Sequence, residues 1–188
     1  MKMQRLSRGS NSGGEEEAMT KWIRVSAFKS KETDVSAAAF WSVLRDWGAL
    51  MAWAGADLFE GTAPAPVIGC DLRKGHSVDV LPCTREIRMK TDGRIPELFE
   101  ETLLYADPEA RFIYYNIEGV GQGGMRNYLA TTTVDEIAKN RCRVTCSSRF
   151  DVPEGGPADE LKAFLEDVYE RSVIHGMTKV ALQKKLAG

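Results

Sequence analysis

Apolar positions near the end of the chain recur every three or four residues. This spacing extends over residues 158–186 and predicts one long helix with a wide apolar face. The face consists of Leu161, Leu165, Val168, Tyr169, Val173, Met177 and Val180. A shorter stripe of the same spacing predicts a helix before Gly48, with Asp34 or Ser36 as its N-cap. Its apolar residues are Phe40, Trp41, Leu44 and Trp47. A second short helix is expected over residues 49–53.

Short apolar runs separated by turn residues predict strands over residues 22–29 and through the region 57–151. No long helical pattern interrupts the second region, so we expect the sheet to be antiparallel. Two short helices, a curved sheet and one long helix bury their apolar faces only if the sheet wraps around the last helix. The sequence therefore predicts an α+β fold of the helix-grip type.

Alternation along the strands separates inward from outward side chains. Strand 142–150 divides cleanly into two faces. The more apolar face carries Cys142, Val144, Cys146, Ser148 and Phe150. No cationic or histidine side chain shares this face to activate a thiol. We therefore interpret both thiols as small buried hydrophobic groups, not as nucleophiles or ligands.

Two other predicted strands carry a charged side chain on the inward face. These are Arg85 in strand 84–90, with Ile87 and Met89, and Glu101 in strand 97–105, with Phe99, Leu103 and Tyr105. Because an unpaired buried charge is costly, Arg85 and Glu101 should contact each other, water or a ligand. Two interpretations stay open: the polar end of an apolar cavity, or an internal ion pair or charges that reach the rim of the sheet. Tyr115 and Tyr128, on the following strands, favour a convergent polar cluster.

Composition and charge exclude several classes of protein. The chain has 188 residues, with 25 basic and 27 acidic side chains and a net charge of −2. It lacks a basic stripe for nucleic acid and an apolar run near the roughly 20 residues that span a bilayer. Residues 1–20 are polar and rich in Gly and Ser, which predicts a disordered tail before one domain over residues 21–188. An organelle presequence is the alternative for this tail.

The four cysteines, residues 70, 83, 142 and 146, do not form the two close pairs of a zinc site. They are also too sparse for a disulfide scaffold, which predicts reduced thiols and a cytoplasmic location. We expect no metal and no cofactor. The first strand and the stretch 62–82 are candidate contacts for a homodimer.

Six segments in a fixed order carry a likeness to a known family. They are residues 40–48 (FWSVLRDWG), 83–93 (CTREIRMKTDG), 101–107 (ETLLYAD), 113–119 (IYYNIEG), 127–131 (NYLAT) and 144–150 (VTCSSRF). Together they resemble the START-like (SRPBCC) superfamily, specifically its polyketide cyclase/dehydrase branch, over about residues 21–186. The resemblance implies a seven-stranded sheet that grips the long helix, with a hydrophobic ligand cavity between them. It also implies lipids, hormones or polyketides as ligands.

Among the enzymes of this superfamily, the chain looks most like plant lachrymatory-factor synthases. In those enzymes an arginine and a glutamate on neighbouring strands act on a small sulfenic acid, with tyrosines nearby. The resemblance assigns these roles to Arg85, Glu101, Tyr115 and Tyr128. A rival match at residues 69–73 puts Arg73 in place of Arg85. We favour Arg85, because Asp92-Gly93 then supplies the hairpin turn before the Glu101 strand.

Two functions are compatible with these observations. The first is a binding module for a small hydrophobic ligand, lipid or polyketide-like. Its predicted lining is Phe99, Leu103, Tyr115, Tyr128, Val144, Phe150, Tyr169, Val173 and Met177. The second is a lyase, cyclase or isomerase with Glu101 as proton shuttle, since apolar surroundings favour a neutral carboxyl group, and with Arg85 as anion anchor. An adaptor without a ligand is a third alternative.

Overall fold

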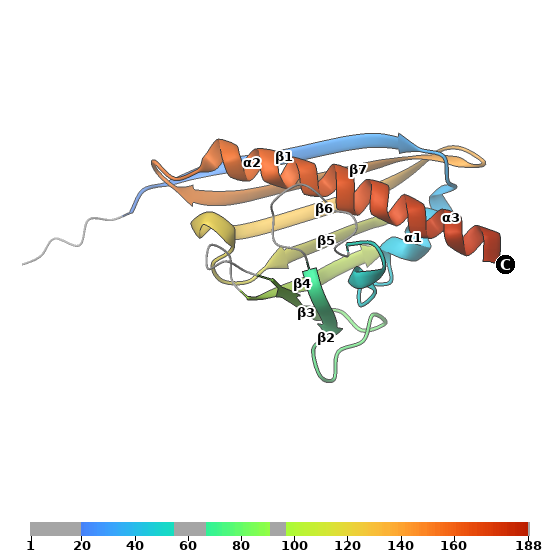
Figure 1. Ribbon diagram of the computed structural model, residues 1–188, viewed down its shortest axis with the longest axis horizontal. Coiled ribbons are helices and arrows are strands. Elements are labelled where there is room, and N and C mark those ends of the chain that lie inside the picture. The colour runs from blue at the N-terminus through green and yellow to red at the C-terminus, as the bar shows by residue number, and fades with distance from the viewer. Residues whose placement is uncertain (1–19, 55–66, 91–96, 188) are drawn as a thin grey trace, which may run out of the picture.

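The computed structural model describes residues 20–54, 67–90 and 97–187. One long helix lies across the face of a curved antiparallel sheet, and short helices cover one end of it (Figure 1). This is the helix-grip architecture that the sequence predicts. Three predicted features lie outside the described residues: the tail up to residue 19, the beginning of the stretch 62–82, and the Asp92-Gly93 turn.

The sheet has seven strands, and every neighbouring pair is antiparallel. The strands are β1 (Trp22–Thr33), β2 (Val67–Leu72), β3 (Cys83–Met89), β4 (Leu98–Asp107), β5 (Phe112–Ile117), β6 (Arg126–Ala138) and β7 (Arg141–Pro153). Their order across the sheet is β1-β7-β6-β5-β4-β3-β2. The strands β2 to β7 are therefore neighbours in sequence order, and the chain crosses from one edge of the sheet to the other between β1 and β2. The short helices lie in this crossing.

The first helix, α1 (Ala37–Leu44), begins at Ser36, whose Oγ accepts a hydrogen bond from the Ala39 N–H at 3.2 Å. Of the two predicted caps, the structure uses Ser36. The second short helix is η1 (Leu50–Ala52), a 3₁₀ turn that packs against β2. Trp47 lies between the two helices, and its side chain is buried.

The last helix runs from Ala158 to Ala187, but its winding changes in the middle. It consists of α2 (Ala158–Val168), the π-helical segment η4 (Tyr169–Gly176) and α3 (Met177–Ala187). A π-helix forms its hydrogen bonds over five residues instead of four, so one additional residue enters the turn. Within η4 the buried residues are Tyr169, Ser172, Val173, Ile174 and Gly176. Among these buried residues, Ser172 adds an aliphatic hydroxyl to the face that the apolar pattern defines.

A β-bulge in β4 changes the face of one predicted inward residue. The register between β4 and β5 shifts between Leu103 and Tyr105. After this shift Ala106 packs against the core, whereas Tyr105 is 50% exposed. The expectation that Tyr105 faces inward is therefore wrong. A bulge adds a residue to one strand, so it reverses the alternation without any signal in the local pattern.

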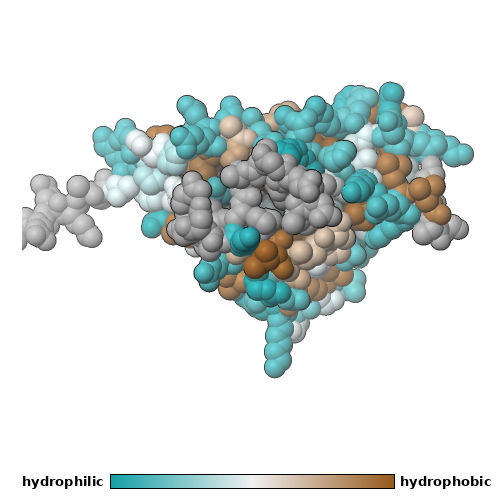
Figure 2. Space-filling view, in the orientation of Figure 1, coloured by the Kyte–Doolittle hydropathy of each residue, from teal (hydrophilic) through white to brown (hydrophobic). Residues whose placement is uncertain are grey.

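The densest part of the core lies between the helices and the half of the sheet formed by β6 and β7. The predicted inward face of strand 142–150 is confirmed, since all five of its residues are buried. Phe40 and Val43 of α1 fill the same region. On the otherwise hydrophilic surface, apolar side chains gather near β2 and along α3 (Figure 2). The exposed apolar residues of these elements include Ile68, Leu182 and Leu186.

Candidate functional site

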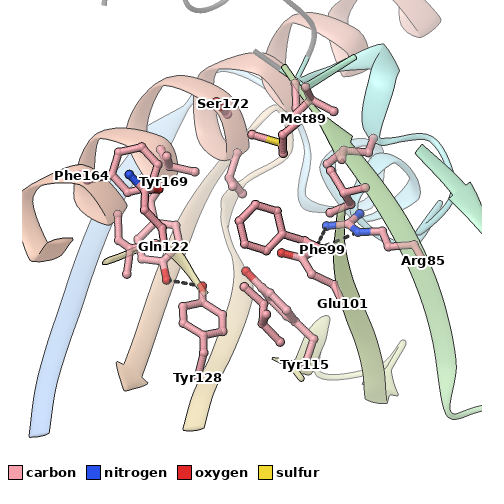
Figure 3. Close-up of a pocket in the computed structure, with 18 of the residues that line it drawn as sticks. Arg85, Met89, Phe99, Glu101, Tyr115, Gln122, Tyr128, Phe164, Tyr169 and Ser172 are labelled. Atoms are coloured by element: carbon pink, nitrogen blue, oxygen red, sulfur yellow. Dashed lines mark hydrogen bonds and ion pairs between the residues drawn. The ribbon is translucent and has the colours of Figure 1, made fainter. Parts of the chain in front are cut away.

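A cavity of about 150 Å³ lies between the last helix and the strands β3 to β6 (Figure 3). Most of its walls are apolar, and they include Ile87, Met89, Phe99, Ile117, Phe164 and Val173. Eight side chains with polar groups interrupt these walls: Trp53, Arg85, Glu101, Tyr115, Gln122, Tyr128, Tyr169 and Ser172. Apolar walls with a few convergent polar groups are typical of small-molecule sites.

The strands β3 and β4 place Arg85 directly opposite Glu101. Nε and Nη2 of Arg85 both donate to the same carboxylate oxygen, Oε2, and the Nε–Oε2 distance is 2.8 Å. The two side chains are only 5% and 14% exposed. The second oxygen of Glu101 is turned toward the cavity (Figure 3). Arg85 and Glu101 therefore form an internal ion pair, and the same pair is also a polar part of the cavity wall.

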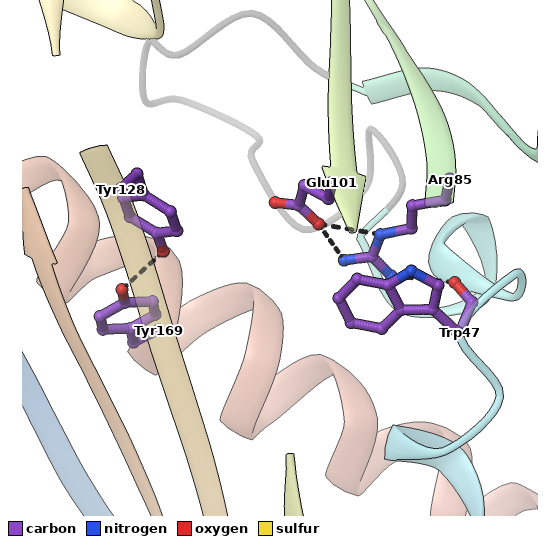
Figure 4. A network of polar contacts seen from close by, with 5 residues as sticks. All are labelled: Trp47, Arg85, Glu101, Tyr128 and Tyr169. Carbon is purple, nitrogen blue, oxygen red and sulfur yellow. Dashed lines mark hydrogen bonds and ion pairs between the residues drawn. The ribbon is translucent and has the colours of Figure 1, made fainter. Parts of the chain in front are cut away.

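Trp47 holds the guanidinium of Arg85 from another side (Figure 4). Nη1 donates to the backbone oxygen of Trp47 at 3.0 Å, and Cζ lies 3.6 Å from the centroid of the indole ring. A buried cation–π contact of this kind contributes about 2 kcal/mol. The same ring meets Tyr115 edge-on, with 5.2 Å between the ring centroids. Glu101 and Trp47 together fix the position of the guanidinium.

The rival arginine lies elsewhere. Arg73 follows β2 and pairs with Glu100 and Glu86, which alternate with Glu101 and Arg85 along their strands and so face the other side of the sheet. The structure thus places Arg85, not Arg73, beside Glu101.

Three buried tyrosines form another polar part of the cavity. The hydroxyl groups of Tyr128 and Tyr169 share a hydrogen bond of 2.8 Å (Figure 4). The ring of Tyr115 lies 6.2 Å from that of Tyr128, measured between centroids. Burial is the main cause that holds the pKa values of Tyr115 and Tyr128 well above the usual 10, and it also raises the pKa of Tyr169. The phenols therefore stay protonated at neutral pH and act as hydrogen-bonding groups, not as bases.

Sequence comparison identifies the family. A family model described as polyketide cyclase / dehydrase and lipid transport matches residues 24–181. The chain belongs to this family. No curated protein matches the chain significantly in sequence.

Solved structures confirm the fold of this polyketide cyclase/dehydrase family member. Norcoclaurine synthase from Thalictrum flavum matches with a TM-score of 0.65 and 17% identity, over 86% of this chain and 95% of that chain. Protein XoxI from Bacillus cereus gives a TM-score of 0.64 and 18% identity, over 86% and 98% of the two chains. A Thermobifida fusca protein gives 0.65 and 20% identity, over 83% and 92%. At these identities the likeness shows the helix-grip fold alone.

The structure brings only some of the predicted lining residues to the cavity of this family member. Phe99, Tyr115, Tyr128, Tyr169 and Val173 line it. Leu103, Val144, Phe150 and Met177 are buried in the core and are not part of the lining. The alternation of strands and the period of helices identify the inward face. They do not reveal where along that face the packing leaves a space.

Other lining residues were missed by the sequence analysis. Trp53 follows η1, and Gln122 belongs to the 3₁₀ turn η3 (Gln122–Gly124) in the glycine-rich loop between β5 and β6. The glycine-rich stretch 119–124 between two predicted strands indicates a hairpin loop at the mouth of the cavity, but not which of its side chains lines the space. A signal did exist for Ser172, which comes three residues after Tyr169 and so lies on the predicted helix face.

The thiols do not have the character of reactive groups. Burial raises the pKa of all four, and that of Cys146 to about 12. All four cysteines are free of disulfide bonds. Within residues 20–54, 67–90 and 97–187, no group of three or more His, Cys, Asp or Glu side chains could hold a metal ion. In the same ranges, no helix is both long enough and apolar enough to cross a membrane.

Proposed function

We propose that this family member binds a small hydrophobic ligand in the cavity between the sheet and the last helix. The observation that carries the proposal is a largely apolar cavity with a carboxylate and three phenols in its walls. A cavity of about 150 Å³ accommodates a molecule of roughly the size of benzene. The expected ligand is therefore a single-ring or short-chain compound, which extends beyond the cavity if it is larger. The family description, which names polyketides and lipids, supports the same class.

Toluene, followed by amide chemical shifts in NMR, is a direct probe of this cavity. We expect saturable shifts at residues of the lining. The variant Val173→Phe fills part of the cavity and should abolish them. Leu182→Phe introduces the same side chain at an exposed position of the same helix and should bind toluene like the natural protein. An absence of binding, or equal binding by Val173→Phe, would contradict the proposal.

A second candidate function is a lyase, cyclase or isomerase that uses Glu101. The observation in its favour is the second carboxylate oxygen of Glu101, which takes no part in the bonds from Arg85 and faces the apolar cavity. In this mechanism that oxygen takes a proton from the substrate and returns it at another atom. Tyr115 and Tyr128 donate hydrogen bonds to a substrate oxygen. Arg85 contributes by fixing the carboxylate and by placing positive charge behind it.

The catalytic candidate is tested after native mass spectrometry has identified a co-purifying ligand or its chemical class. Compounds of that class are incubated with the protein, and the products are analysed by mass spectrometry. Glu101→Gln keeps the shape of the side chain but removes the base, so it should retain binding and lose conversion. Conversion at the natural rate by Glu101→Gln would eliminate this mechanism and leave the binding function intact.

A further inference from the structure

The hydroxyl of Ser172 is buried without a partner among the described residues. The residue is 1% exposed, and among the described residues its Oγ has no hydrogen-bond partner. Ser172 lines the cavity from the π-helical segment of the last helix (Figure 3). A serine or threonine inside a helix commonly bonds to a carbonyl one turn earlier. Thr178 does so in the same helix, where its hydroxyl donates to the Ile174 carbonyl at 2.6 Å. Ser172 leaves this bond unmade, although burying an unpaired hydroxyl is costly.

A second unpaired group belongs to the same lining. The indole Nε1 of Trp53 is buried and has no hydrogen-bond partner in the described part of the chain. An indole N–H only donates, whereas a hydroxyl both donates and accepts. An acceptor atom on a bound molecule is therefore the one type of partner that suits both groups. The Glu101 oxygen on the cavity side has the opposite requirement, because a carboxylate only accepts.

We propose that Ser172 forms a subsite that binds an acceptor oxygen of the ligand, such as a carbonyl or ether oxygen. The inference rests on the proposed binding function and narrows its ligand class. The ligand has a small apolar body and an acceptor oxygen on the side of the last helix. Ser172 is buried on the helix side that lines the cavity, together with Tyr169 and Val173, and this position supports the role.

A pair of probes of equal shape separates this hydrogen bond from apolar burial. Acetophenone carries a carbonyl oxygen where α-methylstyrene carries a methylene group. Their dissociation constants are measured by NMR titration with the natural protein, Ser172→Ala and Thr178→Val. Thr178→Val is the matched control, because it removes a hydroxyl from the same helix outside the cavity lining. The midpoint of thermal unfolding is recorded for each variant.

We expect Ser172→Ala to weaken acetophenone binding about fivefold, the size of one neutral hydrogen bond, and to leave α-methylstyrene within about twofold. Its unfolding midpoint should stay equal or rise, since the lost hydroxyl has no partner in the described part of the chain. Thr178→Val should change neither affinity. Unchanged acetophenone binding by Ser172→Ala, or the same loss in Thr178→Val, overturns the subsite while the cavity proposal stands. If neither probe nor toluene binds the natural protein, the binding function itself fails, and the subsite fails with it.

Discussion

Arg85 is a buried cation whose contacts come from Glu101 and Trp47. Two of its nitrogen atoms bond one carboxylate oxygen, a third bonds a backbone oxygen, and an indole ring covers one side. A buried ion pair contributes little net stability, because both charges lose their hydration. Its effect here is on orientation, since it leaves one oxygen of Glu101 on the cavity side.

Removing one partner of this pair should be much more costly than removing both. We expect Arg85→Met to lower the free energy of unfolding by about 3 kcal/mol, because Glu101 is left buried without a counter-charge. Arg85→Met combined with Glu101→Leu should recover most of this loss. Urea unfolding measures the free energy of unfolding of the natural protein, of Arg85→Met and of the double variant. The control is Arg73→Met, which breaks a more exposed pair and should cost less than about 1 kcal/mol. Equal losses for the single and the double variant would contradict the interpretation.

The contribution of the Tyr128–Tyr169 hydrogen bond to stability should also be measurable by substitution. Tyr128→Phe removes one hydroxyl and leaves the Tyr169 hydroxyl without this partner, so we expect a loss of about 1–2 kcal/mol. Tyr105→Phe removes a hydroxyl from a half-exposed side chain and should cost less than about 0.5 kcal/mol. Thermal unfolding of the two variants distinguishes them, and an equally small effect of both would show that the buried bond contributes nothing.

At the scale of elements, ion pairs hold the π-helical segment to the edge strand. Glu170 of η4 contacts Lys29 and Lys31 of β1 at 2.5 Å and 2.7 Å. These lysines are the main reason that the pKa of Glu170 lies below its usual value. The pairs are partly exposed, so they determine where η4 meets β1 more than they stabilise the fold.

The turn η3 is a second element whose placement affects the cavity, and its glycine Gly123 provides a test. Gly123 has φ +63°, and a Cβ there would lie 3.1 Å from the methyl groups of Leu161 in α2. Gly119, in the same loop, has φ +79° and open space around it. An alanine at either position costs about 1 kcal/mol for the left-handed backbone. Gly123→Ala should cost about 1 kcal/mol more, because Leu161 must move.

Urea unfolding compares the two glycine variants, and toluene titration reports on the cavity. Gln122 of the turn and Met125, which follows it, line the cavity, so Gly123→Ala should also weaken toluene binding. Gly119→Ala should bind normally. Equal stability and equal binding of the two variants would show that η3 packs on α2 without consequence for the cavity.

At the scale of the whole molecule, the buried acids predict how stability depends on alkaline pH. Burial raises the pKa of Cys146 to about 12 and holds those of Tyr115 and Tyr128 well above 10. In the unfolded chain these groups lose their protons near pH 9 for the thiol and near pH 10 for the phenols. Above these values the unfolded state binds fewer protons than the folded state, so stability falls as pH rises. Below about pH 8, one unit under the pKa of the thiol in the unfolded chain, these groups contribute almost no pH dependence.

Urea unfolding between pH 7 and pH 11 measures this dependence. We expect the free energy of unfolding to decline from about pH 9. Cys146→Ala should decline less steeply than the natural protein, although the substitution lowers the stability at every pH. Parallel curves for the two proteins would show that the thiol does not contribute.

Much of the architecture could be predicted because its signals are local. The period of the last helix, the cap at Ser36 and the alternation of strand 142–150 each depend on neighbouring residues. The same alternation placed Arg85 and Glu101 on the inward side, where an uncompensated charge is unfavourable. The expected tail and the Asp92-Gly93 turn stay predictions.

By itself, the sequence determined which faces of the strands and helices are apolar, and hence that the sheet must wrap around the last helix. Only the tertiary structure decided where the space inside lies. The bulge in β4, the π-helical winding of residues 169–176 and the contact of Gln122 with the cavity became visible only in the folded chain. A cavity is a place where packing is incomplete, so its position depends on how four strands and a helix fit together. No single segment of the chain contains that information.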